Sequence, residues 1–153
     1  MTNRRSEIRM SSEEISEFLR GRHTMSVATI CPDGRIHLVA MWYGFIGGWP
    51  AFHTYAKSQK VQNLRRDPRI TVLVEDGDTY DSLRGVQISG TGEIVEDEET
   101  KVRLALEVME RYGPAGSPPG DRDMRAFAER FVTKRVAVRI HPERVVSWDH
   151  RKL

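Results

Sequence analysis

The chain has 153 residues, of which 39% are hydrophobic and 30% are charged, and its net charge is +2. These values predict one globular domain with a buried core. They exclude collagen-like, disordered and membrane-spanning proteins, because no stretch approaches the ~18 consecutive apolar residues of a spanning helix. One cysteine, Cys31, excludes an internal disulfide and a multi-cysteine metal site. The first ten residues lack the apolar run of a secretory signal, so we expect a cytoplasmic protein.

Residues 1–10 are predicted to form a flexible arm, and residues 11–153 to form a single domain. The spacing of Ser11 and Glu14 is that of a capping box, in which each side chain satisfies a backbone N–H at the start of a helix. The helix is predicted to end at Gly21, because glycine readily terminates helices.

Most of the remaining chain is predicted to form consecutive strands. Strand-forming runs bounded by Pro, Gly and Asp turns indicate strands at Thr24–Ile30, Arg35–Tyr43, Ala51–Tyr55, Arg69–Glu75, Arg84–Val95, Arg135–Ile140 and Arg144–Trp148. Helices are indicated at Gln59–Arg66, Glu98–Tyr112 and Asp123–Phe131, with a Pro- and Gly-rich loop over 113–120. This is not a βαβ alternation, so we expect an α+β, mainly β fold: a small barrel of six to seven antiparallel strands with three to four flanking helices.

The most informative local feature is the segment FHTYAKSQK, Phe52–Lys60, where a strand ends and a helix begins near Ser58. A helix N-terminus presents unpaired N–H groups and the positive end of the helix dipole, which together favour a phosphate. Thr54 and Ser58 add hydroxyl donors, and Lys57 and Lys60 add positive charge. The segment predicts a phosphate seat, although a solvated helix start with surface lysines has the same composition.

Positive charge is concentrated between Tyr55 and Arg69, where five Lys and Arg residues face a single carboxylate, Asp67. So short a cluster favours a compact anion over a nucleic acid, which usually meets a broader basic surface. The histidines lie in separate segments without metal-ligand spacing, so no metal site is predicted. No catalytic residue is assigned, since Cys31 has no obvious charged partner to activate it.

These segments together resemble the pyridoxamine 5′-phosphate oxidase-like family of split β-barrels. The resemblance rests on TICPDGR at Thr29–Arg35, on FHTYAKSQK followed by VQNLRRDPRITVLV, and on VQISGTGEI at Val86–Ile94. It covers about residues 12–97, with a weaker match at Val145–Trp148. It implies a split β-barrel and a homodimer that binds its cofactor in a groove between the subunits.

The family has branches that use FMN, haem or the deazaflavin coenzyme F420, and the departures of this chain favour the last. In the vitamin B6 oxidase branch an Arg and a Lys on the second strand hold the FMN phosphate, whereas IHLVAMWY here offers neither. Gln59 stands where that signature has Arg, and Gly85 stands where a glutamine is expected. We therefore expect coenzyme F420 as the cofactor, with FMN as the alternative.

The resemblance implies a cofactor-binding set that consists of Met41, Trp42, His53, Thr54, Lys57, Ser58, Lys60, Asn63 and Trp148. Lys57 and Lys60 would meet the phosphate or the polyglutamate tail of the cofactor. Met41 or Trp42 would lie against the ring. Trp148 would close the site from the partner subunit, unless it plugs its own barrel.

The leading hypothesis is a homodimeric oxidoreductase that transfers hydride from reduced deazaflavin to a conjugated small molecule, such as a biliverdin-like tetrapyrrole, an unsaturated lactone or a quinone. The alternatives are an FMN enzyme of the same fold, a non-catalytic carrier of flavin or deazaflavin, and a nucleic-acid binder, which the short basic cluster disfavours. Neither a membrane nor a nucleic acid is expected as a partner.

Overall fold

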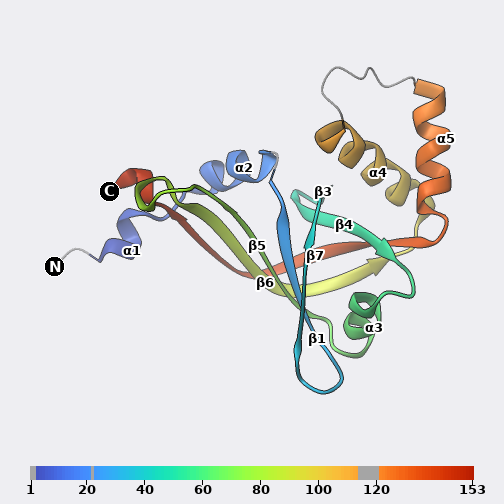
Figure 1. Cartoon of the computed structure of the whole chain (residues 1–153), viewed down its shortest axis with the longest axis horizontal. Coiled ribbons are helices and arrows are strands. Elements are labelled where there is room, and N and C mark those ends of the chain that lie inside the picture. The colour runs from blue at the N-terminus through green and yellow to red at the C-terminus, as the bar shows by residue number, and fades with distance from the viewer. Residues whose placement is uncertain (1–2, 22, 114–120) are drawn as a thin grey trace.

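Figure 1 shows the computed structural model, which describes residues 3–21, 23–113 and 121–153. The described residues form one antiparallel sheet in the order β2-β1-β5-β6-β7-β4-β3. The strands are β1 Met25–Ile30, β2 Ile36–Met41, β3 Gly44–Ile46, β4 Trp49–Tyr55, β5 Arg69–Asp76, β6 Arg84–Val95 and β7 Arg135–Asp149. The helices are α1 Arg4–Glu7, α2 Ser12–Arg20, α3 Gln59–Arg66, α4 Glu98–Tyr112 and α5 Asp121–Val132, with short 3-10 turns η1 Tyr80–Ser82 and η2 His150–Lys152.

The predicted mainly β, split-barrel fold is confirmed, and the position of the split follows from the strand pairing. β2 is one edge of the sheet, and β3 at the other edge pairs only with Trp49–Ala51 of β4. On the side away from β7, the second half of β4, Phe52–Tyr55, therefore has no strand partner among the described residues. The barrel is open between this half of β4 and the free edge of β2.

Alternation along the strands gives the sheet an inner and an outer face. Val27, Val72 and Ile88 are paired in register on neighbouring strands and are at most 1% exposed, so they form the inner face. The outer face carries Leu38 and Val146, which are 67% and 39% exposed. The chain thus leaves exposed apolar side chains on the outer face of β2 and β7.

The helices α2 to α5 form at or near the residue ranges that the sequence predicts, and they lie against the barrel. α2 begins with the predicted capping box: Ser11 Oγ accepts a hydrogen bond from Glu14 N at 3.2 Å, and Ser11 N donates to Glu14 Oε2 at 2.7 Å. α4 and α5 pack on each other through Val102, Ala105, Ala128 and Val132. No helix among the described residues is long and apolar enough to cross a membrane.

The prediction of two separate strands at the end of the chain is wrong. β7 runs unbroken through His141 and Pro142, where the sequence analysis places a break. The ladder with β6 shifts register between Ser89 and Gly90, and Gly90 stands opposite Pro142. A Cβ on Gly90 would lie 2.0 Å from the carbonyl oxygen of His141, so the missing side chain lets the two strands stay paired across the bulge.

The structure also contains two elements that the sequence analysis does not predict. β3 forms a hairpin with β4 across Gly47-Gly48, whose φ values of 62° and 82° favour glycine. α1 lies inside the predicted arm, and Met10 at the end of that arm is only 5% exposed. The arm is therefore packed at its C-terminal part. The predicted loop over 113–120 lies outside the described residues from residue 114 onward.

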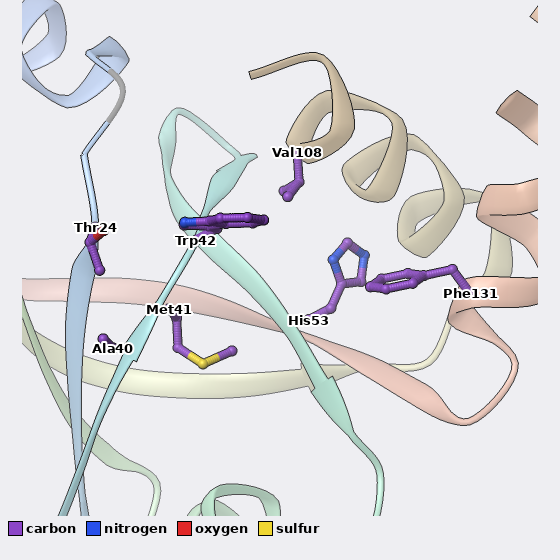
Figure 2. A pocket seen from close by; sticks show the side chains of 7 residues that line it. All are labelled: Thr24, Ala40, Met41, Trp42, His53, Val108 and Phe131. Carbon is purple, nitrogen blue, oxygen red and sulfur yellow. The ribbon is translucent and has the colours of Figure 1, made fainter. Parts of the chain in front are cut away.

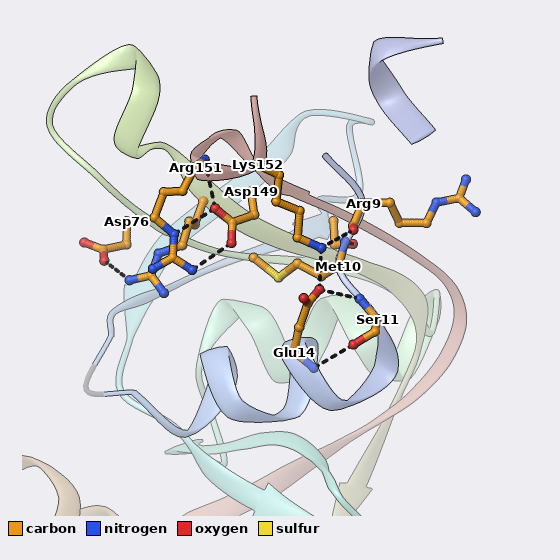
Figure 3. Close-up of polar contacts among 10 residues, drawn as sticks. Arg9, Met10, Ser11, Glu14, Asp76, Asp149, Arg151 and Lys152 are labelled. Atoms are coloured by element: carbon orange, nitrogen blue, oxygen red, sulfur yellow. Dashed lines mark hydrogen bonds and ion pairs between the residues drawn. The ribbon is translucent and has the colours of Figure 1, made fainter. Parts of the chain in front are cut away.

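The two ends of the chain meet where β6 begins and β7 ends (Figure 3). Lys152 Nζ donates to Arg9 O at 2.8 Å and to Glu14 Oε2 at 2.6 Å. The buried carboxylate of Asp149 accepts hydrogen bonds from Arg151 Nε at 2.9 Å and Nη2 at 2.7 Å, and this contact lowers the pKa of Asp149. We call these five residues the terminal clasp, because they tie the last turn of the chain to the start of α2.

Candidate functional site

Two cavities lie along the free edge of β2, one toward each end of the strand. The β4 cavity has a volume of about 360 Å³ and is lined by Thr24, Ala40, Met41, Trp42, His53, Val108 and Phe131 (Figure 2). The hairpin cavity has a volume of about 600 Å³ and is lined by Cys31, Pro32, Asp33, Arg35, Ile36, His37, Leu38 and Gln59. Volumes of this size suit a small organic ligand.

The β4 cavity brings together three predicted site residues, Met41, Trp42 and His53 (Figure 2). Trp42 is 57% exposed, and its ring stacks on that of Tyr112 from α4 with centroids 5.1 Å apart. Phe131 from α5 closes the cavity on the side of His53. The walls are therefore flat and mostly apolar, which suits an aromatic ring.

His53 is fixed in this wall by its own contacts. Its Nε2 lies 2.9 Å from the carbonyl oxygen of Lys101, and its ring meets Phe131 edge-on at 5.7 Å. Burial lowers the pKa of His53. The imidazole is thus neutral near pH 7, and it gives the cavity an uncharged surface rather than a cation.

The start of α3 carries the predicted phosphate-binding residues. Ser58 caps the helix: its Oγ accepts from Val61 N at 3.4 Å and from Thr54 Oγ1 at 3.1 Å. Lys60 in the first turn is only 9% exposed, and its ammonium makes no ion pair or hydrogen bond within the part of the chain that the structure describes. Burial lowers the pKa of Lys60. The ammonium itself is not among the fully covered atoms, so a bound anion could reach it and would pair with its charge.

Asn63 is fully buried behind this helix start, and its amide is occupied by protein groups. Nδ2 donates to Thr29 Oγ1 at 3.1 Å, and Oδ1 accepts from Gln59 Nε2 at 2.8 Å. Asn63 thus joins α3 to β1 and orients the helix start. A direct contact of Asn63 with a cofactor stays a prediction.

Two members of the predicted set lie apart from the others. Lys57 is exposed next to the start of α3. Trp148 pairs with Gly85, whereas Thr54 pairs with Val136, twelve residues earlier on the same strand β7. Twelve strand residues span roughly 40 Å at about 3.3 Å each. Within one chain Trp148 does not join the cavities, and its contribution from a partner stays a prediction.

Gly85 explains where Trp148 lies. A Cβ on Gly85 would be 2.2 Å from Cζ2 of Trp148, so the indole rests directly on the backbone of β6. Both residues belong to the outer face, because they continue the alternation of Val146 and its partner Gln87. Trp148 therefore does not plug its own barrel, and the glycine that replaces the expected glutamine makes room for it.

Arg111 is not among the predicted site residues, yet it contacts Tyr112, whose ring stacks on Trp42. Its guanidinium lies 4.9 Å from the ring centroid of Tyr43 and 5.4 Å from that of Tyr112, and its Nε donates to Tyr43 O at 3.1 Å. Tyr112 in turn stacks on Trp42. Nothing local in the sequence marks Arg111, because the backbone carbonyl groups that it binds lie 68 or more residues away along the chain.

His37 was also missed, although the sequence holds a signal for it. It occupies an inward position of β2, in alternation with Val39 and Met41, where a polar residue needs a partner.

No group of three or more His, Cys, Asp or Glu residues that could hold a metal is found in the described ranges.

The fold and the candidate site define a split β-barrel protein with two cavities along its open edge. Within that class, the chain belongs to the pyridoxamine 5′-phosphate oxidase family, whose model matches residues 11–149. No curated protein matches the chain.

Solved structures agree with this assignment. The conserved hypothetical protein Rv2991 from Mycobacterium tuberculosis is 49% identical with a TM-score of 0.90, and the match covers 99% of this chain and 92% of that one. An F420 reductase is 28% identical with a TM-score of 0.62, over 85% of this chain and 94% of that one. HutZ, the haem storage protein from Vibrio cholerae, is 17% identical with a TM-score of 0.66, over 89% and 94%, and shares the fold alone.

Proposed function

We propose that this protein is a homodimeric oxidoreductase that uses coenzyme F420 to reduce a conjugated small molecule, such as a quinone, an unsaturated lactone or a tetrapyrrole of the biliverdin type. The observation that carries the proposal is Lys60 in the first turn of α3, whose side chain is only 9% exposed and whose ammonium has no hydrogen bond or ion pair among the described residues. An unpaired ammonium on a largely buried side chain is prepared for an anionic group. A phosphorylated cofactor supplies one.

The residues present fit a flavin-type cofactor. Thr54, Ser58 and Lys60 would hold its phosphate at the start of α3, where the helix dipole adds to the positive charge. Met41 and Trp42 would give its ring an apolar wall in the β4 cavity. Neutral His53 would complete that wall without adding charge.

Two observations favour the deazaflavin over FMN. β2 carries no Arg or Lys between Ile36 and Met41, so it lacks the pair of cations that hold FMN phosphate in the vitamin B6 branch. The similarity to an F420 reductase, at 28% identity over most of both chains, supports the same choice. The proposal therefore ranks coenzyme F420 first and FMN second.

The chemistry would come from the cofactor, and reduced deazaflavin supplies a hydride while reacting poorly with oxygen. The chain's task is to bind, to orient and to exclude water. Trp42, which is held by its stack on Tyr112, and the ring of Phe131 supply apolar walls. The acceptor needs a proton besides the hydride, and we assign no side chain to deliver it.

The proposal includes a two-fold dimer that would cover the outer face of the sheet. Ile36 and Leu38 on β2 are 62% and 67% exposed, and Val146 and Trp148 lie on the same face of β7. A second copy would bury these residues and could bring the partner's Trp148 toward the cavities. An obligate dimer of this kind would bury more than about 2,000 Å².

A spectroscopic titration tests the choice of cofactor. The purified protein is titrated without oxygen against coenzyme F420, FMN and riboflavin, with tryptophan quenching as the readout. We expect coenzyme F420 to bind at least about tenfold more tightly than FMN, and riboflavin, which lacks phosphate, to bind weakest. Submicromolar binding of FMN without detectable binding of coenzyme F420 would contradict the proposal.

Turnover separates an enzyme from a carrier. Reduced coenzyme F420 is mixed with a quinone and with protein, and the return of the oxidised cofactor's absorbance is followed. Acceleration that saturates with quinone supports the enzyme. Tight cofactor binding without acceleration for quinone, lactone or tetrapyrrole acceptors would indicate the carrier instead.

A further inference from the structure

One end of the barrel interior is polar, unlike the rest of the core. Val27 and its partner Val39 are the last apolar pair of inner residues on β1 and β2, and Thr29 and its partner His37 follow. Cys31 comes next on the same face of the chain. This polar layer lies beside the hairpin cavity, which both His37 and Cys31 line.

All but one member of this layer have partners in the protein. Thr29 accepts from Asn63 Nδ2 at 3.1 Å, and Cys31 Sγ lies 3.6 Å from the same nitrogen. Gln59 donates to Asn63 Oδ1 at 2.8 Å. The exception is His37, whose buried Nδ1 is the only buried side-chain nitrogen or oxygen without a hydrogen-bond partner among the residues that the structure describes.

A buried polar atom without a hydrogen-bond partner points to a missing partner, because leaving it unpaired costs free energy. The hairpin cavity, at about 600 Å³, is large enough to hold that partner. The cavity straddles the free edge of β2: Ile36 and Leu38 line it from the outer face and His37 from the inner face. A ligand in the split of the barrel could therefore contact the imidazole, and a turn of the ring about its Cβ–Cγ bond would present the covered Nδ1 to it.

The surroundings favour an anionic oxygen as the missing partner. Gln59, the first residue of α3, lines the same cavity, so the positive end of that helix faces it. Arg35 lines it too, and its guanidinium is mostly exposed and only loosely paired, with Nε 3.6 Å from Asp33 Oδ2. The positive charge of Arg35 and the positive end of the helix dipole together exceed the single negative charge of Asp33.

We infer that the hairpin cavity is an anion-binding subsite in which Nδ1 of His37 donates a hydrogen bond to a phosphate or carboxylate oxygen of the ligand. The inference rests on the proposed function in taking that oxygen to belong to the phosphate or the acidic tail of the cofactor. It adds a ligand contact on β2, the strand that lacks the cations of the vitamin B6 branch. It also places Arg35 and Gln59 beside His37 in the subsite.

The experiment compares two replacements of His37, one that keeps a hydrogen-bond donor near the position of Nδ1 and one that removes it. In His37→Asn the amide nitrogen is bonded to Cγ, as Nδ1 is in histidine, so a donor remains near the same place. His37→Phe keeps the ring and removes the donor. His141→Phe is the matched control, because His141 is an exposed histidine that lines neither cavity. Dissociation constants are measured for coenzyme F420, FMN and riboflavin.

We expect His37→Phe to weaken the binding of coenzyme F420 about tenfold or more, and His37→Asn to restore most of the loss. Riboflavin, without phosphate or tail, should bind both variants as it binds the wild type. A loss for both FMN and coenzyme F420 assigns the oxygen to the phosphate, and a loss for coenzyme F420 alone assigns it to the tail. Equal losses for all three ligands, or none, would overturn the inference.

A separate measurement keeps this inference apart from the proposed function. If the wild-type protein binds none of the three ligands, the proposed cofactor is wrong. The imidazole ¹⁵N resonances of His37 in the wild-type protein are then followed during addition of inorganic phosphate. A saturable shift of Nδ1 that His141 does not show supports the anion subsite, and no shift overturns it.

Discussion

Replacing Lys60 with methionine should weaken cofactor binding without harming the apo-protein. Methionine keeps an unbranched apolar stem of similar length, so the packing around the 9% exposed side chain is largely retained. The loss is one charge-assisted contact to phosphate, worth about 1.5–3 kcal/mol, or roughly 10- to 150-fold in the dissociation constant. Titration of the variant with coenzyme F420 and FMN measures this loss directly.

The stability of the same variant follows from the pKa of Lys60, which burial lowers. The unfolded chain holds this proton more tightly than the folded chain, so the charged side chain disfavours folding at pH 7. That cost is relieved as the pH rises through the folded pKa toward the unfolded value of about 10.4. Lys60→Met should therefore melt at or above the wild-type temperature at pH 7, and this advantage should shrink at pH 9.5.

Lys57→Met is the matched control for both measurements. Lys57 lies three residues away, carries the same charge and is exposed, so its loss should alter binding by only a few-fold and the melting temperature very little. The reasoning is refuted if Lys60→Met binds the cofactor like wild type. It is equally refuted if Lys60→Met melts several degrees lower at pH 7, because the ammonium would then stabilise the fold.

Four further predictions concern residues outside the start of α3. Trp148→Ala should weaken cofactor binding roughly threefold to tenfold and reduce the dimer fraction in sedimentation, with little change in the midpoint of urea unfolding. In Gly85→Ala the new Cβ would lie 2.2 Å from Trp148, so the indole must move; its fluorescence emission should shift, and stability should fall by about 1–3 kcal/mol. Arg111→Ala should cost about 2–4 kcal/mol in urea unfolding, because several carbonyl groups lose a charged donor, and Arg111→Lys should restore only part of it. Asp149→Asn should be less stable than wild type at pH 7, and the difference in acid unfolding should vanish as the pH falls through the lowered pKa of Asp149, below about 4.

Residue spacing and the signals for helix and strand ends were enough to predict most of the helices and strands. α3, α4, β6 and the capping box of α2 stand where spacing and end signals place them. The errors occur where tertiary pairing overrides local signals. Pro142 breaks a strand in sequence terms, yet β7 continues because Gly90 on the neighbouring strand yields the space for a bulge. No property of residues 141 and 142 alone predicts that.

The candidate site, too, contains residues that sequence patterns predict and residues that only the folded chain brings together. Thr54, Ser58 and Lys60 lie within seven residues, so a short motif predicts them together; in the structure Thr54 and Ser58 form a hydrogen bond, and Lys60 follows in the first turn of α3. Arg111 acts through partners that lie far away in sequence, which only the folded chain brings near. The unpaired nitrogen of His37 is visible only once every neighbour's hydrogen bonds are accounted for. Sequence patterns therefore predict a candidate anion site on one short segment more readily than the residues that surround it.

The position of β7 has a consequence for how the protein is made. β7 follows the other six described strands in sequence, yet it lies between β6 and β4 in the sheet. At about 5–20 residues per second on the ribosome, the β3–β4 hairpin waits roughly 5–20 s before its neighbour emerges. During that interval the nascent chain holds two unjoined pieces of sheet with open edges. Because the terminal clasp also needs Asp149 and Lys152, a chain cut off before Asp149 should be treated as unfinished by chaperones and proteases.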